Sequence, residues 1–418
     1  MRVLFLSARY PPDVLGGGEI STQLIAEALA ATGASVTVVC GAAGEGDDVL
    51  HGVRVIRTRP LLSWWSKPLR EVLVSRAAAQ TVAALLPRHA LQPDVIHAQE
   101  FRSALSLSFL PHPHRIVTIR DYAPICGTTN NMWWDGSSCD GCFWTNVLFR
   151  CHRVVEASLP RKPFRVAQYK GNLGFRTRAF RRIPHHLYTS QCLRRRVEAR
   201  LRPPPTVQTM ILQNPVDPRW LTTPLVPRPE ENVLCAAGRL ETTKGTDILL
   251  QAVAEAQKTF PDLRLHLAGS GELPRYRALA DRLGLRDAVT FHGAVPPAEV
   301  SDLMDRSAIV VSAHLWEEPF GRAALEAGAR ARPLVASDLG GVLETTTSQT
   351  AALVPPNDPS ALAGALIRLL RNRDDATAMG DAARAYVKER FAPQSIANQL
   401  LQYYDRCARD GVRERGEP

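Results

Sequence analysis

The chain has 418 residues, which is too long for one simple hydrophobic core, so we expect two domains. Apolar residues make up 45% of it, which excludes bulk disorder, and no apolar run reaches the roughly 18 residues that a membrane-spanning helix needs. The formal net charge of +10 is concentrated in residues 150–200, where fourteen Lys and Arg stand against two acidic residues, Glu156 and Glu198.

The N-terminal seven residues combine one positive charge with a very short apolar run, which predicts a β-strand and not a signal peptide. We therefore expect a cytoplasmic protein, with peripheral attachment to the inner membrane face as an alternative. Val- and Ile-rich runs predict further strands in the first half, and apolar spacing predicts a helix over residues 19–32. The predicted strands are residues 3–6, 35–40, 53–56, 94–97, 116–119 and 209–212.

The second half repeats this alternation after a Pro- and charge-rich connection at residues 218–231. Strands alternating with helices predict an α/β fold of two doubly wound parallel-sheet domains, with ligand crevices at the carboxyl ends of the strands. The predicted strands are residues 232–237, 263–268, 289–292, 308–312, 333–337 and 351–354. The predicted helices are residues 246–259, 274–283, 297–305, 323–331, 359–372, 374–389 and 394–406.

Three glycines, Gly16, Gly17 and Gly18, stand between the first strand and the first helix. They let the backbone approach a ligand closely, and the helix N-terminus points its N–H groups at an anion. The spacing is not that of a dinucleotide-binding or P-loop motif. A flexible turn is the alternative interpretation.

Two cations, Arg239 and Lys244, follow the first strand of the second half. At this position in a doubly wound fold they could converge on a diphosphate and stabilise it as a leaving group. The alternative is two surface cations in a turn. Gly269 follows the next strand in the same way.

The segment from Glu318 to Glu326 combines two carboxylates with a Pro-Phe-Gly turn that leads into a helix. Glu318 could accept hydrogen bonds from sugar hydroxyls, the helix N-terminus could hold phosphate, and Glu326 could reach a ribose. The segment therefore offers partners for the parts of a nucleotide-sugar. The alternative is an ordinary loop-to-helix junction with two solvated glutamates.

These motifs, in this order and spacing, resemble family 4 of the retaining glycosyltransferases, which have the GT-B architecture, and the resemblance covers nearly the whole chain. It implies transfer of a sugar from a nucleotide diphosphate-sugar to an acceptor hydroxyl, in the synthesis of a glycan, glycolipid or glycosylated metabolite. It also implies an acceptor-side domain at residues 1–213, carrying a Cys- and Trp-rich loop at residues 120–152, and a donor-binding domain at residues 214–389. A C-terminal helix, at about residues 390–418, would pack back on the first domain.

The resemblance assigns roles to individual residues and requires no cofactor for catalysis. Arg239 and Lys244 would bind the donor diphosphate in place of a catalytic metal, and Glu318 with the amides of Phe320 and Gly321 would hold the donor sugar. Glu326 would contact the ribose. The remaining donor-side residues are Gly16, Gly17, Gly18, Gly269 and Gly293, and the acceptor-side residues are Glu19, His97, Asp121 and Tyr122.

Arg120 stands where members of the family often carry a histidine, just before Asp121 and Tyr122. Arginine can donate hydrogen bonds or stabilise negative charge, but it cannot act as a general base near neutral pH. We count Arg120 among the catalytic candidates. The substitution also motivates an alternative, in which the chain is a non-catalytic GT-B scaffold that binds a nucleotide-sugar or glycan as a partner subunit.

Four cysteines crowd into one loop and could bind a structural zinc ion, with His152 as a substitute ligand; the alternative is unligated thiols. They are Cys126, Cys139, Cys142 and Cys151. The neighbouring Trp133, Trp134 and Trp144 could stack on a sugar acceptor, sit at a bilayer interface or cover the loop's own core.

The basic residues 150–200 predict an anionic partner, either a membrane surface or a lipid-linked pyrophosphate acceptor, and the alternative is a solvated basic helix. We expect no nucleic-acid partner, because the donor-site motifs account better for the chain.

Overall fold

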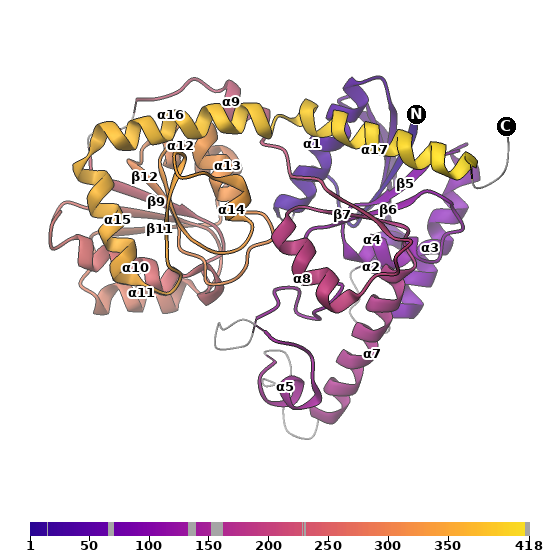
Figure 1. The fold of residues 1–418 in the computed structure, drawn as a ribbon, viewed down its shortest axis with the longest axis horizontal. Coiled ribbons are helices and arrows are strands. Elements are labelled where there is room, and N and C mark those ends of the chain that lie inside the picture. Colours follow the sequence, from indigo (N-terminus) through magenta and orange to yellow (C-terminus); the bar gives the residue numbers. More distant parts are fainter. Residues whose placement is uncertain are drawn as a thin grey trace. The chain divides into compact units, whose positions relative to one another are not determined.

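The computed structural model describes residues 1–14, 16–65, 71–132, 139–151, 162–227, 229 and 231–413. The chain forms two compact units (Figure 1). Unit 1 contains most of residues 1–215 and the C-terminal segment from Pro393, and unit 2 contains Val216–Ala392.

Unit 1 is built on an eight-stranded sheet of order β3-β4-β2-β1-β5-β6-β7-β8. All neighbouring strands are parallel except β3 and β4. The strands are β1 (Arg2–Ser7), β2 (Ser35–Gly41), β3 (Gly46–Leu50), β4 (Val53–Thr58), β5 (Val95–Ala98), β6 (Arg115–Ile119), β7 (His185–Tyr188) and β8 (Gln208–Ile211). The helices are α1 (Gly17–Ala31), α2 (Arg59–Trp65), α3 (Glu71–Arg88), α4 (Phe101–Leu107), α5 (Trp144–Phe149), α7 (Lys162–Arg181), α8 (Gln191–Leu201) and α17 (Pro393–Arg413).

Strands β3 and β7 are absent from the sequence prediction, for two different reasons. β3 is an exposed edge strand with two aspartates, and it pairs with β4 while Asp47 and Asp48 form ion pairs with Arg54 and Arg57. A strand exposed on both faces shows no apolar pattern. β7 is fully buried, but its sequence is His-His-Leu-Tyr, and its polar residues give no apolar pattern from which a core strand could be predicted.

The core of unit 1 is completed by the last helix of the chain. Alternate residues of β1 and β2 pack with α1 and α17 in one cluster, to which α17 contributes Ile396, Leu400, Tyr403 and Tyr404. Two hydrogen bonds add direction to this packing: the Tyr404 hydroxyl lies 2.6 Å from His97 Nδ1, and the Tyr403 hydroxyl lies 3.1 Å from His185 Nδ1. Helix α17 is therefore an integral part of unit 1.

Unit 2 is built on a six-stranded, wholly parallel sheet of order β11-β10-β9-β12-β13-β14. Separate apolar clusters cover its two faces, which suits a parallel sheet buried on both sides. The strands are β9 (Val233–Ala237), β10 (Arg264–Ala268), β11 (Val289–Gly293), β12 (Ile309–Ser312), β13 (Leu334–Ser337) and β14 (Ala351–Val354). The helices are α9 (Pro218–Thr222), η2 (Thr242–Lys244), α10 (Thr246–Ala256), α11 (Leu273–Arg282), α12 (Pro297–Asp305), α13 (Arg322–Ala329), α14 (Val342–Thr345), α15 (Pro359–Arg371) and α16 (Arg373–Arg390).

Each sheet has a point where the strand order reverses. In unit 1, β1 lies between β2 and β5, and in unit 2, β9 lies between β10 and β12. Loops that leave the carboxyl ends of such strands diverge and form the ligand crevice of a doubly wound fold. The loops after β1 and β5, and those after β9 and β12, are therefore where sites are expected.

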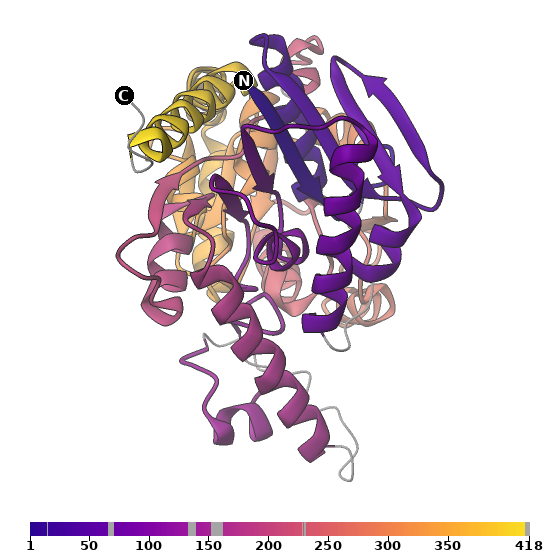
Figure 2. The ribbon, with the colours of Figure 1, turned by 90° about the vertical axis from the view of Figure 1, so that its right-hand side faces the viewer.

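A helical projection extends from unit 1. Helix α7 runs away from the sheet and carries α5 at its far end (Figures 1 and 2). Val147 of α5 packs on Val166 of α7, together with Cys142, Leu148 and Tyr169. Along the described parts of the chain, no helix combines the length and the apolar character needed to cross a bilayer.

Candidate functional site

The loops after β9 and β12 pack backbone against backbone at the switch point of unit 2. Leu315 N–H donates to the carbonyl of Thr243 at 2.8 Å. Gly245 has a φ of +65°, and a Cβ at this position would lie 1.7 Å from the carbonyl oxygen of Ala313. Only glycine fits here, and the contact fixes Lys244 against the β12 loop.

This packing brings two of the predicted catalytic residues together. Lys244 Nζ forms an ion pair with Glu318 Oε1 and lies 5.4 Å from the ring centroid of Trp316. Glu318 is only 8% exposed. Burial by itself raises the pKa of Glu318, but the Lys244 charge, with smaller contributions from His314 and from hydrogen bonds, outweighs burial and lowers it. Glu318 is therefore an ionised acceptor held at the switch point.

Arg239 lies in the same loop as Lys244 but is exposed, with no hydrogen bond or ion pair to the residues that the structure describes. Its loop is held to the β10 loop, since Leu240 N–H donates to the Ser270 carbonyl at 2.8 Å. A Cβ on Gly269 would lie 1.7 Å from the Gly238 carbonyl oxygen, and Gly269 N–H donates to the Gly293 carbonyl at 2.7 Å. The predicted glycines thus hold the loops together at the carboxyl edge of the sheet.

The turn after Glu318 opens helix α13. Gly321, with a φ of +89°, is the N-cap residue and supplies no side-chain cap. The Phe320 side chain packs in the core against Phe391, so only its backbone is available for the predicted sugar contact. Glu326 forms an ion pair with Arg322 at 3.3 Å, and burial raises its pKa. A ribose would have to compete with Arg322 for this carboxylate.

In unit 1, Glu19 caps the helix that the glycine turn opens. Its Oε2 accepts a hydrogen bond from Gly16 N–H at 3.1 Å, in a capping box at the start of α1. The carboxylate therefore lies at the N-terminus where Gly16, Gly17 and Gly18 were expected to meet an anion. An anionic ligand at this helix start would have to displace Glu19, and the predicted acceptor-side role of Glu19 stays a prediction.

Arg120 is held by two residues that the sequence analysis did not assign. Its guanidinium donates to the carbonyl and to the Oε1 of Gln99, both at 3.0 Å, and to Oδ1 of Asn214. Gln99 is almost fully buried, and its Nε2 has no partner among the described residues. Gly18 lies alongside, because a Cβ there would be 3.8 Å from Arg120 Cδ. Gln99 could have been found, since it lies two residues after the strand predicted at residues 94–97.

The other predicted acceptor-side residues are less accessible than expected. His97 is fully buried, and its ring nitrogens lie 2.6 Å from the Tyr404 hydroxyl and 2.7 Å from Thr118 Oγ1. Burial, and then the Arg120 charge, hold its pKa well below the usual range, so it is a neutral core residue and not an acceptor contact.

Asp121 and Tyr122 follow β6. The Tyr122 side chain is fully buried. Asp121 is half-buried, its Oδ1 accepts from Ala123 N–H at 2.8 Å, and burial raises its pKa to about 6. Of the four predicted acceptor-side residues, Asp121 alone combines partial exposure with a perturbed pKa, which is a feature of functional sites.

The four cysteines gather around Tyr169 but do not form the predicted zinc site. Cys142 Sγ lies 3.7 Å from the Tyr169 hydroxyl, and Cys139 and Cys151 pack on the same ring. Burial raises the pKa of the Cys142 thiol to about 11. Nowhere in the described ranges are three His, Cys, Asp or Glu side chains placed to hold a metal ion. His152, Trp133 and Trp134 lie outside the described residues.

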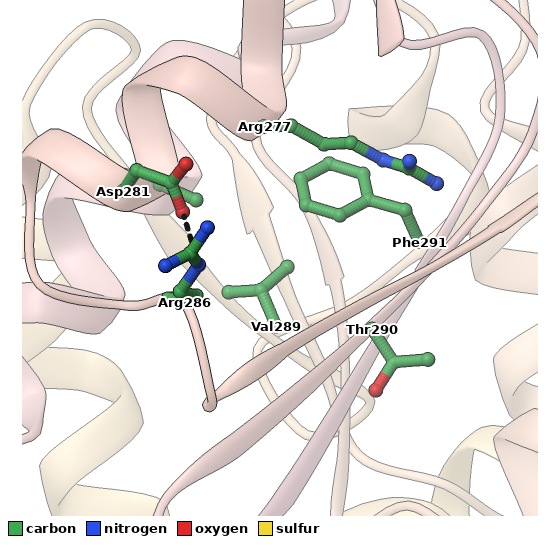
Figure 3. A pocket seen from close by; sticks show the side chains of 7 residues that line it. Arg277, Asp281, Arg286, Val289, Thr290 and Phe291 are labelled. Carbon is green, nitrogen blue, oxygen red and sulfur yellow. Dashed lines mark ion pairs between the residues drawn. The ribbon is translucent and has the colours of Figure 1, made fainter. Parts of the chain in front are cut away.

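A pocket of about 370 Å³ lies at the edge strand β11, away from the predicted site (Figure 3). Arg277 lies over the ring of Phe291, with its guanidinium carbon 5.7 Å from the ring centroid, and Arg286 forms a 3.6 Å ion pair with Asp281. This ion pair is exposed, where such pairs contribute little energy. No predicted donor residue lines the pocket, and β10 and β9 separate its strand from β12.

Two family models match the chain, one in each half. The Glycosyl transferase 4-like domain matches residues 16–212, and Glycosyl transferases group 1 matches residues 223–386. The D-inositol 3-phosphate glycosyltransferase of Segniliparus rotundus is 35% identical over 190 residues, which cover 44% of this chain and 42% of that protein. This match spans less than half of the relative's length. The glycogen synthase of Mycobacterium tuberculosis is 26% identical over 425 residues, covering 97% of this chain and 94% of that protein.

Solved structures share the fold over both units. Sucrose-phosphate synthase from Thermosynechococcus elongatus has a TM-score of 0.72 at 21% identity, covering 97% of this chain and 98% of that chain. Anabaena HepE, in complex with UDP and glucose, has a TM-score of 0.67 at 19% identity, covering 97% and 99%. The predicted GT-B fold is confirmed, and the chain joins a glycosyl transferase 4-like domain to a glycosyl transferases group 1 domain.

Proposed function

We propose that this chain is a retaining glycosyltransferase that moves a sugar from a nucleotide diphosphate-sugar to an acceptor hydroxyl. The observation that carries the proposal is the Lys244–Glu318 pair at the switch point of unit 2, with Arg239 exposed in the same loop. The pair joins a buried, ionised hydrogen-bond acceptor to one cation, and Arg239 adds a second cation in the same loop; these are the groups that a sugar and a diphosphate require together.

In the proposed reaction, the bond between the sugar's anomeric carbon and the β-phosphate oxygen breaks, and a bond to the acceptor oxygen forms. Lys244 and Arg239 stabilise the negative charge that gathers on the departing diphosphate. Glu318 accepts hydrogen bonds from sugar hydroxyls and holds the ring. The acceptor's proton passes to the leaving phosphate oxygen on the same face of the sugar, so no protein base is needed and the anomeric configuration is retained.

Arg120 contributes a fixed positive charge in this proposal. Gln99 and Asn214 orient its guanidinium. A donor-sugar or acceptor oxygen could accept from the guanidinium. Because arginine stays protonated, Arg120 would act by hydrogen bonding and charge. We place the enzyme in the cytoplasm, or at the inner membrane face, in glycan, glycolipid or glycosylated-metabolite synthesis.

Donor binding and nucleotide release test the proposal separately. The structural neighbour HepE was solved with UDP, so UDP-sugars head a thermal-shift screen that also includes GDP-, ADP- and dTDP-sugars. A bound donor raises the unfolding temperature by mass action. We expect one nucleotide class to shift the transition and to release nucleoside diphosphate when acceptor is supplied. Binding of a nucleotide-sugar without release across a broad acceptor panel would favour the non-catalytic scaffold, and no binding at all would overturn the proposal.

A further inference from the structure

The loop between β12 and α13 carries a buried histidine that the proposed reaction does not use. His314 is only 1% exposed and lies shortly before Glu318 in the chain. Its Nε2 lies 2.9 Å from the carbonyl oxygen of Leu339, and its Nδ1 lies 3.3 Å from Ser312 Oγ. Because a carbonyl oxygen only accepts, Nε2 carries a proton and donates to Leu339 whether the ring is neutral or charged.

Leu339 belongs to the loop that follows β13, residues 338–341, which we call the β13 loop. Asp338 N–H donates to the carbonyl of Val354 at 2.8 Å, and this bond ties the start of the loop to the end of β14. The next residue, Leu339, accepts the hydrogen bond from His314. The β13 loop is therefore held by β14 on one side and by His314 of the β12 loop on the other.

The β13 loop packs directly on the backbone of the turn that carries Glu318. Gly341 N–H donates to the carbonyl of Glu318 at 2.6 Å. A Cβ on Gly340 would lie 2.6 Å from Glu318 N, and a Cβ on Gly341 would lie 2.6 Å from Phe320 Cα. Both positions therefore require glycine, because any side chain would push the two backbones apart. With the backbones in direct contact, the position of the β13 loop sets the position of Glu318.

The segment that leads to Glu318 is held from its other side by the loop that carries Lys244. β12 lies between β9 and β13 in the sheet, so the loop after β12 has a neighbouring loop on each side. Leu315 N–H donates to the carbonyl of Thr243 in the loop after β9, at 2.8 Å, while His314 donates to the loop after β13. Two consecutive residues thus bind opposite neighbours, and together they fix the start of this segment in both directions.

The His314 ring also acts on the Glu318 carboxylate through its charge. Burial by itself raises the pKa of Glu318, the Lys244 charge lowers it, and a charge on His314 lowers it further. Charge effects weaken with distance, so the ring lies near the carboxylate as well as near the loop that supports it. His314 is therefore connected to Glu318 by backbone contacts and by electrostatics.

We propose that His314 is a positioning residue for the sugar transfer: through Leu339 it holds the β13 loop against the turn of Glu318, and so fixes where that carboxylate meets the donor sugar. The inference rests on the proposed function, because the sugar is the ligand that we assign to Glu318. His314 acts through Glu318 and does not contact the reacting atoms. A shift of about 1 Å in a group that positions a substrate can cost roughly 10²-fold in rate, so losing this support should be measurable.

Two substitutions of His314 in the full chain separate the roles of its ring nitrogens. Gln places an N–H near the position of Nε2 and can keep the bond to Leu339, whereas the shorter Asn reaches only the position of Nδ1 and loses that bond. We expect His314→Asn to lower kcat/KM by roughly 10–100-fold for the nucleotide-sugar that the thermal-shift screen selects, and His314→Gln to retain most of the activity. The inhibition constant of the free nucleoside diphosphate should change far less in His314→Asn, because this product lacks the sugar that Glu318 holds.

A double variant shows whether His314 acts through Glu318. In a Glu318→Gln background, His314→Asn should cause little further loss of kcat/KM, because the carboxylate that His314 positions is already absent. The matched control is His266→Asn, which removes a 2.9 Å hydrogen bond between two histidines, His266 and His292, elsewhere in unit 2. This control should transfer sugar as the unchanged protein does.

The proposal is overturned if His314→Asn and His314→Gln transfer sugar equally, or if nucleoside diphosphate affinity falls in step with kcat/KM. It is also overturned if the losses caused by His314→Asn and Glu318→Gln multiply. If the unchanged chain transfers no sugar, the proposed function fails, and the free energies of unfolding of the unchanged chain, the two single variants and the double variant test this inference alone. Non-additive losses of stability would support the link between His314 and Glu318, and additive losses would overturn it.

Discussion

Replacing Lys244 with Met should separate the structural role of the Lys244–Glu318 pair from its proposed catalytic role. The Lys244 side chain is 30% exposed and that of Glu318 is 10% exposed. The pair is therefore intermediate in burial. Exposed ion pairs contribute about 0–1 kcal/mol to stability, and breaking a buried pair costs about 3–5 kcal/mol. We expect Lys244→Met to lower the free energy of unfolding of unit 2 by about 2 kcal/mol, because it leaves a buried carboxylate without its cation.

A double variant completes the test. Lys244→Met with Glu318→Gln removes both charges, so part of the lost stability should return, with a coupling energy of about 1–2 kcal/mol. Transfer should fall by roughly 10²–10³-fold in Lys244→Met and should stay low in the double variant, because the charge facing the diphosphate is absent from both. Lys258→Met, at an exposed lysine of the same unit, is the control for both measurements.

The pH dependence of stability gives a third measurement on the same variants. The folded-state pKa of Glu318 lies below its ordinary value of 4.5. The pair therefore stabilises the fold above the unfolded pKa, and that stabilisation is lost as pH falls through the folded pKa. Lys244→Met should abolish this acid-side loss. Wild-type turnover in Lys244→Met, or a double variant no more stable than the sum of its parts, would refute the reasoning.

Three further predictions concern single positions. Gly245→Ala should lower the free energy of unfolding by about 2 kcal/mol or more, since the new Cβ collides with the β12 loop. It should also remove most of the donor-induced thermal shift, and unaltered donor binding would contradict this prediction. Tyr404→Phe should lower the free energy of unfolding by about 1–3 kcal/mol, because it leaves His97 Nδ1 unpaired in the core. The control Tyr386→Phe should leave it nearly unchanged, because the Tyr386 hydroxyl has no partner among the described residues. Asp121→Asn should raise the free energy of unfolding by about 2 kcal/mol at pH 8 and change it little below pH 4, and equal effects at both pH values would count against this prediction. The reason is that the pKa of Asp121 is raised in the folded state, so the folded state loses stability as pH rises from the unfolded pKa of 3.8 to the folded pKa of about 6.

The sequence predicted the architecture well where each strand carried its own apolar signal. All six strands of unit 2 were predicted within one residue at either end, because buried parallel strands are continuous Val- and Leu-rich runs. The sequence did not predict β3, because that segment is a strand only through its pairing with β4. It did not predict β7, because the two histidines of β7 have hydrogen-bond partners only in the folded chain.

The candidate site was predictable by position but not by contact. Arg239, Lys244 and Glu318 each follow a strand that ends at the same edge of the sheet, which the order of elements predicts. That Lys244 pairs with Glu318, and that Glu19 caps its own helix, depends on loop geometry that no local pattern records. Their roles with donor and acceptor remain predictions. His97 was misjudged because its hydrogen-bond partner, Tyr404, lies 307 residues away in the chain.

The return of α17 to unit 1 has a consequence for how the protein is made. A ribosome releases β1 to β8 first, yet the core of unit 1 lacks Ile396, Leu400 and Tyr404 until almost the whole chain has been synthesised. Unit 2 is continuous from Val216 to Ala392, so all of this segment is synthesised before α17, the last helix of unit 1. The second unit to be translated can therefore be the first to fold, and until α17 emerges the apolar face of β1 and α1 is left as a target for chaperones.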